Sequence, residues 1–240
     1  MKICLAQTKS VKGDILANIA KHQHFIQQAI VEKAEAIFFH ELSLTGYEPE
    51  LAESLATTPD DNRFAIFQQM SDNHGITIGL GMPIRTAKGI EITMLIFQTN
   101  QPLQSYAKQQ LHADELPYFV EGHEQLILWP ETLKVAPAIC YESLQASHVQ
   151  TAHALGARVY LASVAKSQKG VDKAYIHYPI IARQYQMPVL MVNCVGYCDN
   201  FVSMGSSGFW NAKGELVAAL DHVREGLLTV DLQREQMALK

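Results

Sequence analysis

The stretch "KVAPAICYES", residues 134–143, points most directly to the fold. Its first part is a short and almost unbroken apolar run, which is typical of a β-strand buried on both faces of a sheet. The run ends at Cys140 and is followed at once by Tyr141 and Glu142. Strands of this kind belong to sheets that helices cover on both sides, so the stretch favours an α/β fold. It also raises the question of why a thiol stands at the end of such a strand.

The rest of the chain alternates similar strands with amphipathic helices. Residues 14–34 place apolar side chains at helical spacing, and Asp14 stands where an N-cap is expected. Further helices are predicted over 60–74, 143–156 and 172–186, and strands over 2–8, 34–41, 76–84, 91–98, 104–110, 133–140, 157–164, 188–196 and 204–220. The segment between 111 and 133 is predicted to be mostly loop with one short strand. This order predicts an α/β sandwich, formed as a single domain over residues 1–240.

Composition excludes several classes of protein. The 240 residues are 48% hydrophobic and 18% charged, with a formal net charge of −5 and no basic stripe, so nucleic acid is not an expected partner. The longest apolar runs are too short to span a bilayer, and the N-terminal segment is interpreted as the first strand, without a signal-peptide cleavage site. The four cysteines, Cys4, Cys140, Cys194 and Cys198, have irregular spacing, which favours a reduced, cytoplasmic chain over a disulfide framework.

Three reactive side chains stand where strands are predicted to end: Glu41, Lys108 and Cys140. Side chains beyond the strand ends of such sheets converge on a shared crevice. A thiol is a modest nucleophile until a base takes its proton or a cation lowers its pKa. A carboxylate can act as that base, and a lysine can hold developing negative charge. The three residues together therefore supply a base, a charge stabiliser and a nucleophile.

The segments around these residues resemble the nitrilase, or carbon–nitrogen hydrolase, superfamily, in its amidase-like branch. The matching segments are "FFHELSLTGYEP", "YAKQQL" and "ICYES", followed by "ARQYQMPVLMVNCVG" and "MGSSGFWNAKGEL". The five occur in the family's order and extend over almost the whole chain. The resemblance implies a four-layer α-β-β-α sandwich, which in this family usually forms a homodimer or higher homo-oligomer.

The resemblance also implies roles for individual residues. Cys140 would be the nucleophile, Glu41 the general base, and Lys108 the stabiliser of the tetrahedral oxyanion, with the backbone N–H of Tyr141 as a second donor. Glu115 stands where the family has a second active-site glutamate, although a shift of one position would put Asp114 there instead. Glu142 is a candidate for substrate contact, with an ion pair at the start of the following helix as the alternative. The predicted helix after Cys140 would place the thiol near a helix N-terminus, where the dipole favours a thiolate.

The expected reaction is cleavage of a non-peptide C–N bond in a small amide or N-carbamoyl compound through a thioester, with release of ammonia. Tyr141 follows the cysteine where nitrilases tend to have Trp, which favours amides over nitriles. No cofactor and no metal are expected, since the histidines lack metal-site spacing. Tyr47, Tyr118, Phe119 and residues 164–166 are candidates for setting pocket size, and Lys166 or Lys169 could hold a carboxylated substrate.

Three alternatives stay open. The same site could hydrolyse nitriles. The fold could serve as a catalytically silent interaction module. The chain could also be a thiol-redox protein that uses Cys140 or the pair Cys194 and Cys198. Replacing Cys140 with Ser would abolish amide hydrolysis but leave a redox function of the pair intact.

Overall fold

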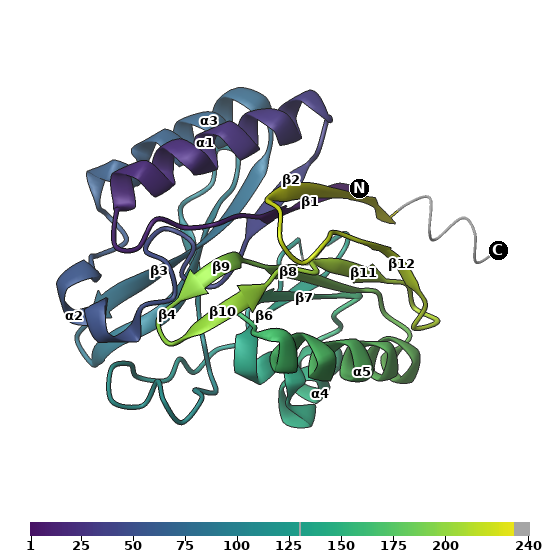
Figure 1. The fold of residues 1–240 in the computed structure, drawn as a ribbon. Helices are drawn as coiled ribbons and strands as arrows, with labels where there is room; N and C mark the ends of the chain where they lie inside the picture. Colours follow the sequence, from purple (N-terminus) through teal and green to yellow (C-terminus); the bar gives the residue numbers. More distant parts are fainter. Residues whose placement is uncertain (130, 233–240) are drawn as a thin grey trace.

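Strands from the two halves of the chain form two large sheets that lie face to face (Figure 1). The computed structural model describes residues 1–129 and 131–232. The first sheet has the strand order β13-β1-β2-β3-β4-β5, and the second has the order β12-β11-β8-β7-β6. The first sheet contains β1 (Lys2–Gln7), β2 (Ala36–Phe39), β3 (Thr77–Thr86), β4 (Gly89–Phe97), β5 (Gln104–Ala107) and β13 (Gly226–Asp231). The second contains β6 (Val135–Ile139), β7 (Val159–Val164), β8 (Val189–Asn193), β11 (Gly208–Trp210) and β12 (Leu216–Ala219).

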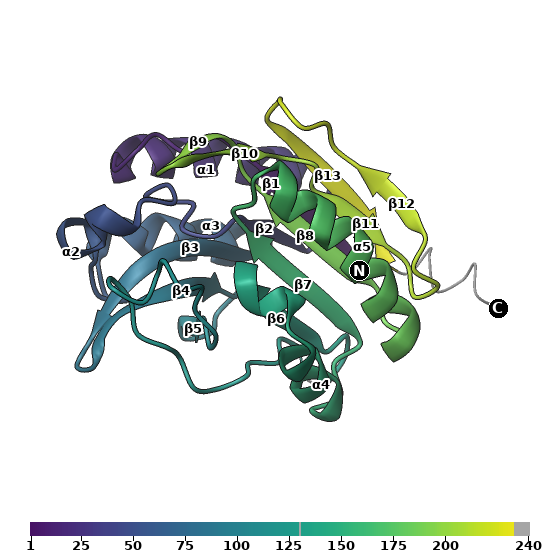
Figure 2. The same cartoon turned by 60° about the horizontal axis from the view of Figure 1, so that its bottom comes forward.

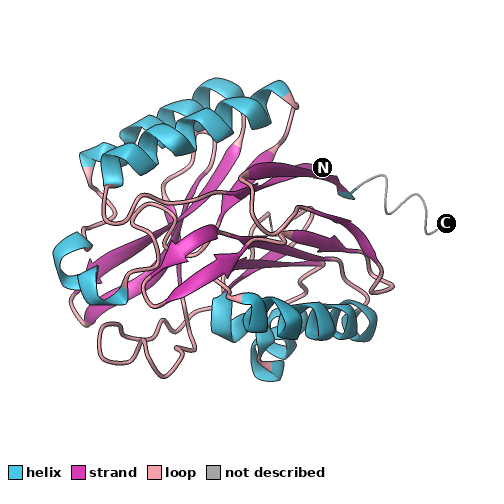
Figure 3. Cartoon of the chain, in the orientation of Figure 1, coloured by secondary structure: helices cyan, strands magenta, loops and turns pink. Residues whose placement is uncertain are grey.

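Helices cover the outer face of each sheet (Figures 1 and 3). Helices α1 (Ile15–Val31) and α3 (Ala65–His74) lie on the first sheet, while α4 (Ala146–Ala154) and α5 (Gln168–Tyr185) lie on the second. A short helix, α2 (Ala52–Leu55), follows the 3₁₀ turn Pro49–Leu51 near the edge of the first sheet. The order of layers is helix, sheet, sheet, helix, which confirms the predicted four-layer α-β-β-α sandwich.

The alternation of side chains along β6 explains its apolar sequence. Val135 and Ile139 belong to the core between the two sheets, whereas Ala136 and Ala138 belong to the core under α4 and α5. Both faces of the strand are therefore buried, and no position is left for a polar side chain. Pro137 is tolerated because β6 is an edge strand of its sheet, where a missing N–H breaks fewer ladder bonds.

Two of the predicted helices begin differently from the prediction. The helix expected over 60–74 is a 3₁₀ turn, Asn62–Phe64, followed by α3, which Gly75 ends in the left-handed conformation with φ 66°. The helix expected over 143–156 starts earlier, as a 3₁₀ helix over Cys140–Leu144, and only then continues as α4. The extended backbone of Gln145 separates the two segments. Cys140 therefore opens a short 3₁₀ turn and does not lie at the N-terminus of a regular α-helix, so this part of the prediction was wrong.

The last third of the chain contains more strands than the sequence pattern predicts. The strand expected over 188–196 is split into β8 and β9 (Val195–Cys198), and β9 forms a separate two-stranded ribbon with β10 (Phe201–Met204). Strand β13 pairs antiparallel with β1 along its full length. In the described part of the segment 111–133, the expected short strand is only an isolated bridge between Leu128 and Val135. Only the place of β13 is decided by pairing with a distant segment, whereas the β9–β10 ribbon and the bridge at Leu128 are pairings between near neighbours in the chain.

The carboxyl ends of both sheets meet at one edge of the molecule. Strands β1, β2 and β3 run parallel in one sheet, and β6, β7 and β8 run parallel in the other. The hydroxyl of Ser163 in β7 donates a hydrogen bond of 2.9 Å to the carbonyl of Phe39 in β2, which joins the two sheets near these ends. The long loop between β5 and β6 passes beside the same edge (Figure 2). Residues that follow β2, β5, β6 and β7 are thereby brought together.

Candidate active site

Cys140 stands on a strained turn directly after β6. Its φ is 47°, in the left-handed region that non-glycine residues rarely adopt, and it begins the 3₁₀ helix Cys140–Leu144. Its Sγ lies 3.6 Å from the carbonyl oxygen of Ala165, which follows β7. A strained backbone conformation at a strand end directs one side chain out of the sheet. Such a conformation persists only where other contacts hold the turn in place.

Lys108 and two glutamates form a buried cluster at the same edge. The Nζ atom of Lys108 donates to Oε1 of Glu41 at 2.8 Å and to Oε1 of Glu115 at 2.6 Å, and all three side chains are almost completely buried. Glu115 also accepts from the hydroxyl of Tyr47 at 2.9 Å and from the backbone N–H of His112 at 2.7 Å. An ammonium has three donors, and in the described part of the chain two acceptors engage it, so one N–H of Lys108 remains for another acceptor.

Glu41 has one engaged and one free carboxylate oxygen. Oε1 accepts from Lys108, whereas Oε2 is buried and has no hydrogen-bond partner among the residues that the structure describes. Burial raises the pKa of Glu41, and the neighbouring Lys108 and, to a smaller extent, the Cys140 thiol oppose this rise. A carboxylate oxygen that is free and next to a thiol is placed to receive its proton.

The loop that carries Glu41 lies tightly against β3. The backbone N–H of Leu44 donates to the carbonyl of Gly81 at 3.0 Å, and the N–H of Gly81 donates to the hydroxyl of Ser43 at 3.1 Å. A Cβ atom on Gly81 would collide with the backbone nitrogen of Leu42. Glycine is therefore required at this position for a close approach of backbone to backbone.

Burial and charge set the protonation of the cluster. Burial and, next to it, the charge of Glu41 raise the pKa of the Cys140 thiol to about 12, while Lys166 and Lys108 oppose this rise. Burial also raises the pKa of Glu41, against the opposing effect of Lys108. Burial alone would lower the pKa of Lys108, but the two carboxylates outweigh it and raise that pKa. The resting sulfur is thus a thiol, so the thiolate expected from a helix dipole is not supported, and attack requires a base.

A cavity of about 480 Å³ opens over Cys140. Its lining combines polar groups near the sulfur with apolar walls, and its residues come from several strand ends and from the start of α5. The lining residues are Tyr47, His112, Asp114, Glu115, Cys140, Tyr141, Leu144, Gln145, Ala165, Lys166, Ser167, Gly170, Lys173, Asn200 and Phe201. Tyr141, the second residue of the 3₁₀ helix, has its backbone N–H in the first turn, where no intrahelical acceptor exists.

The structure separates the acidic residues that the sequence left ambiguous. Glu115 reaches Lys108, whereas Asp114 is half-exposed at the rim and pairs with the ring of His112. Glu142 does not line the cavity. It is buried behind the strand end, where it accepts from the hydroxyl of Tyr106 at 2.7 Å and from backbone N–H groups. Its predicted contact with substrate is therefore replaced by a contact within the protein.

Among the predicted pocket residues, Tyr47, Ala165 and Lys166 line the cavity, while Tyr118, Phe119 and Val164 do not. Sequence reasoning missed the other lining residues, which are His112, Leu144, Gln145, Ser167, Gly170, Lys173, Asn200 and Phe201. The last two lie at the turn of the β9–β10 ribbon, which the sequence pattern did not predict, so no signal pointed to them.

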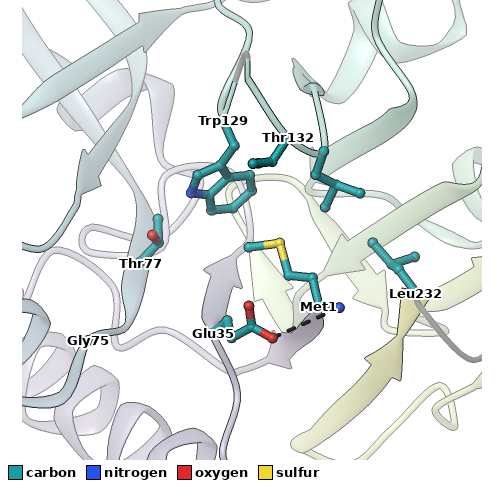
Figure 4. A pocket seen from close by; sticks show the side chains of 8 residues that line it. Met1, Glu35, Gly75, Thr77, Trp129, Thr132 and Leu232 are labelled. Atoms are coloured by element: carbon teal, nitrogen blue, oxygen red, sulfur yellow. Dashed lines mark ion pairs between the residues drawn. The ribbon is translucent and has the colours of Figure 1, made fainter.

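A second cavity, of about 540 Å³, lies at the opposite, amino ends of β1, β2 and β3 (Figure 4). The side chains of Met1, Trp129 and Leu232 border it, and the N-terminal ammonium pairs with Glu35 at 3.9 Å. No cysteine is among its lining residues. It is therefore separate from the site around Cys140.

Other expectations concern metals, membranes and thiols. Within residues 1–129 and 131–232, no cluster of three His, Cys, Asp or Glu side chains is arranged to hold a metal ion. No helix in the same part of the chain is long and apolar enough to cross a bilayer. Cys194 and Cys198 are buried free thiols whose sulfur atoms lie 3.6 Å apart.

Comparison with known proteins decides the family. The model of the carbon–nitrogen hydrolase family matches residues 2–239. The chain belongs to the carbon–nitrogen hydrolase family. This match confirms the family that the segments around Glu41, Lys108 and Cys140 indicated.

Curated relatives of this carbon–nitrogen hydrolase include the glutamine-dependent NAD(+) synthetases of Thermotoga maritima and Acinetobacter baylyi. The identity is 26% over 98% of the chain for the first and 27% over 100% for the second. The chain spans only 42% and 45% of those proteins, which is less than half of their length.

Solved structures similar to this carbon–nitrogen hydrolase include an amidase from Nesterenkonia sp. AN1. A complex of that amidase with butyramide matches with a TM-score of 0.88 and 21% identity, over 100% of this chain and 94% of the other. Another structure of it shows the acetamide moiety of fluoroacetamide covalently added at the active-site cysteine, with a TM-score of 0.88, 22% identity, and coverage of 97% of this chain and 90% of the other. At this identity the likeness establishes the fold.

Proposed function

We propose that this carbon–nitrogen hydrolase is an amidase that cleaves small linear amides or N-carbamoyl compounds through a thioester on Cys140. The observation that carries the proposal is the arrangement around the sulfur: the thiol, a buried carboxylate with one oxygen that no described residue engages, and a buried ammonium that the described residues engage at two of its three N–H groups. The Nesterenkonia amidase, which has the same fold, binds butyramide and is modified at its active-site cysteine. Tyr141 after the cysteine further favours amides over nitriles.

The first half of the reaction forms the thioester. As the sulfur of Cys140 attacks the amide carbon, its proton passes to the free Oε2 of Glu41, and the carbonyl electrons move onto oxygen. The remaining N–H of Lys108 and the backbone N–H of Tyr141 hold this oxyanion. The C–N bond then breaks, and the leaving nitrogen takes the proton from Glu41 and departs as ammonia.

The second half returns the enzyme to its starting state. Water attacks the thioester carbon while Glu41 accepts its proton, and the new oxyanion is held by the same two donors. Collapse breaks the C–S bond, the sulfur regains the proton, and the carboxylic acid is released. Glu115 keeps Lys108 oriented through both halves, since its Oε1 holds the ammonium at 2.6 Å.

The test combines ammonia detection with intact-mass spectrometry on a panel of small amides, N-carbamoyl amino acids and nitriles. Glutamine joins the panel because the curated relatives are named glutamine-dependent enzymes. We expect release of ammonia and an acyl adduct on Cys140 for at least one amide. Cys140→Ala should abolish turnover, and Glu41→Gln should lower it by roughly 100- to 10,000-fold, the range for loss of a general base.

Near-full activity of Glu41→Gln would show that Glu41 is not the base. Nitrile turnover without amide turnover would favour the nitrilase alternative. No turnover of any compound, with an unreactive Cys140, would favour a silent interaction module. Oxidation-dependent behaviour that survives Cys140→Ser would instead point to the pair Cys194 and Cys198.

The proposed assembly is a homodimer or higher homo-oligomer in the cytoplasm, with no nucleic-acid or membrane partner. Helix α5 exposes Ile176 and Ile180, one turn apart, on the outer layer of the sandwich. An apolar pair on the surface of an outer helix is suited to a contact between copies. Light scattering on the purified protein measures the oligomeric state.

A further inference from the structure

A second lysine, Lys166, lies against the nucleophile. Its side chain is only 5% exposed, although it lines the cavity. Its Nζ atom lies 3.4 Å from the carbonyl oxygen of Cys140 and 3.9 Å from the Sγ atom. The mechanism proposed above uses Lys108 and leaves Lys166 without a role.

Lys166 differs from Lys108 in having no carboxylate partner. Lys108 is neutralised by Glu41 and Glu115, whereas no Asp or Glu oxygen in the described parts of the chain lies within 4.0 Å of the Lys166 ammonium. A buried ammonium without an opposite charge is costly, and a protein keeps one only where the surrounding structure holds it in place. The cavity therefore contains positive charge that nothing in the described protein pairs.

The backbone holds Lys166 in this position. Its N–H donates to Oδ1 of Asn193 at 2.9 Å, and its carbonyl accepts from the hydroxyl of Ser203 and the N–H of Met204, each at 3.0 Å. Gly170 gives the side chain room, because a Cβ atom there would lie 3.1 Å from Cβ of Lys166. The lysine is thus fixed before any ligand arrives.

Positive groups from the start of α5 line the cavity together with Lys166, and the acidic residues Asp114 and Glu115 line it as well. Ser167 and Gly170, which also line the cavity, belong to the N-terminus of the 18-residue helix α5, whose dipole is positive at this end. The side chain of Lys173 lines the cavity one turn further along. The carboxylates of Glu41 and Glu115 belong instead to the cluster that handles the amide. The cavity thus has a cationic side and an amide side, both close to the sulfur.

We propose that Lys166 binds a carboxylate of the substrate, so that the substrate class is small amides with a carboxylate no more than three bonds from the carbon that the sulfur attacks. This inference rests on the proposed amidase function. A reacting carbon lies about 3–3.5 Å from the attacking sulfur, and an ammonium holds a carboxylate oxygen at about 2.8 Å. With Nζ 3.9 Å from Sγ, only a short spacer fits between the two groups. Monoamides of malonate and succinate have such a spacer.

Two alkylating reagents test the site without requiring amide turnover. Iodoacetate and iodoacetamide deliver the same carbon to Cys140, but only the first has a carboxylate. A hydrogen bond to a charged group contributes about 1.5–3 kcal/mol, which corresponds to about a 10- to 150-fold effect. We therefore expect the ratio of the two alkylation rates, iodoacetate over iodoacetamide, to fall about 10- to 150-fold in Lys166→Met.

Turnover gives the second readout. The ratio of kcat/KM for succinamate to that for butyramide, which has a methyl group in place of the carboxylate, should fall in Lys166→Met by a similar factor. Lys169→Met is the matched control, because Lys169 is an exposed lysine near the same helix end that does not line the cavity. It should leave both ratios within about twofold of the wild type, since it makes no contact with a bound ligand.

Equal slowing of iodoacetate and iodoacetamide in Lys166→Met would overturn the inference, because it would mean that the lysine acts on the sulfur and not on the ligand. A change of less than threefold in the ratio would overturn it too. If the wild type hydrolyses no amide or N-carbamoyl compound of the panel but the alkylation ratio falls as expected, the anion site stands and the amidase proposal fails. Lys166→Gln, which keeps a polar tip without the charge, provides the same test should the methionine variant not fold.

Discussion

The carboxylate of Glu142 joins the two segments that carry the nucleophile and the lysine. Its Oε1 accepts from the N–H of Ile139 at 2.7 Å and from the hydroxyl of Tyr106 at 2.7 Å. Its Oε2 accepts from the N–H of Gln109 at 2.6 Å and of Gln110 at 3.2 Å, directly after Lys108. All four contacts use the carboxylate as an acceptor. Glu142→Gln replaces one acceptor oxygen with an NH2 donor. It should therefore destabilise the protein and also slow amide hydrolysis.

The size of the effect follows from these contacts. An amide nitrogen in place of Oε2 would face two backbone N–H donors, whereas in place of Oε1 it faces only that of Ile139, because the Tyr106 hydroxyl can also accept. The amide nitrogen therefore takes the Oε1 position, and one hydrogen bond to a charged acceptor is lost. Burial raises the pKa of Glu142 to about 7, so the carboxylate is mostly ionised at pH 8, where this loss should lower the free energy of unfolding by about 1.5–3 kcal/mol. The side chain is 0% exposed, so water cannot replace the lost partners. The turn at Cys140 would also lose its link to the loop that carries Lys108, and a displacement of about 1 Å in an active site can cost 100-fold in rate.

Urea unfolding of the wild type and of Glu142→Gln measures the stability, and ammonia release on the best amide of the panel measures the rate. Glu124→Gln is the control, because Glu124 is an exposed glutamate outside the cavity, and its change should stay within about 0.5 kcal/mol. A loss of less than 1 kcal/mol in Glu142→Gln, or a loss of stability with the rate unchanged, would refute the reasoning that this carboxylate positions the two segments.

Two further predictions concern the nucleophile and its base. Because burial and Glu41 raise the pKa of Cys140 to about 12, the protonated thiol predominates at neutral pH, and the rate of alkylation by iodoacetamide should rise about tenfold per pH unit from pH 7 to 9. A plateau below pH 8 would instead show a resting thiolate. Gly81→Ala would drive a Cβ atom into the backbone of the Glu41 loop, so the melting temperature and the amidase rate should both fall, with a loss of about 1–3 kcal/mol. An unchanged melting temperature would mean that the loop moves aside at little cost.

The sequence by itself determined the class of fold and the chemistry at the strand ends. Buried strands and amphipathic helices have periodic patterns that depend on near neighbours, so the α/β layers could be predicted. Glu41, Lys108 and Cys140 were recognisable because each closes a strand and each is embedded in a segment that resembles the family. The family match confirmed that resemblance. Local periodicity did not reveal β13, because its place is decided by pairing with β1 at the other end of the chain.

Only the tertiary structure decided which polar side chains share one cavity and what charge each carries there. The sequence puts Asp114 next to Glu115, yet only Glu115 reaches Lys108. It puts Glu142 two residues after the nucleophile, yet that carboxylate points into the protein. Lys166 is 26 residues from Cys140 along the chain, and its Nζ lies 3.9 Å from the sulfur. The direction in which each side chain points, its burial and its distance from groups on the other sheet arise from contacts between remote segments. The pKa values of these side chains depend on all three.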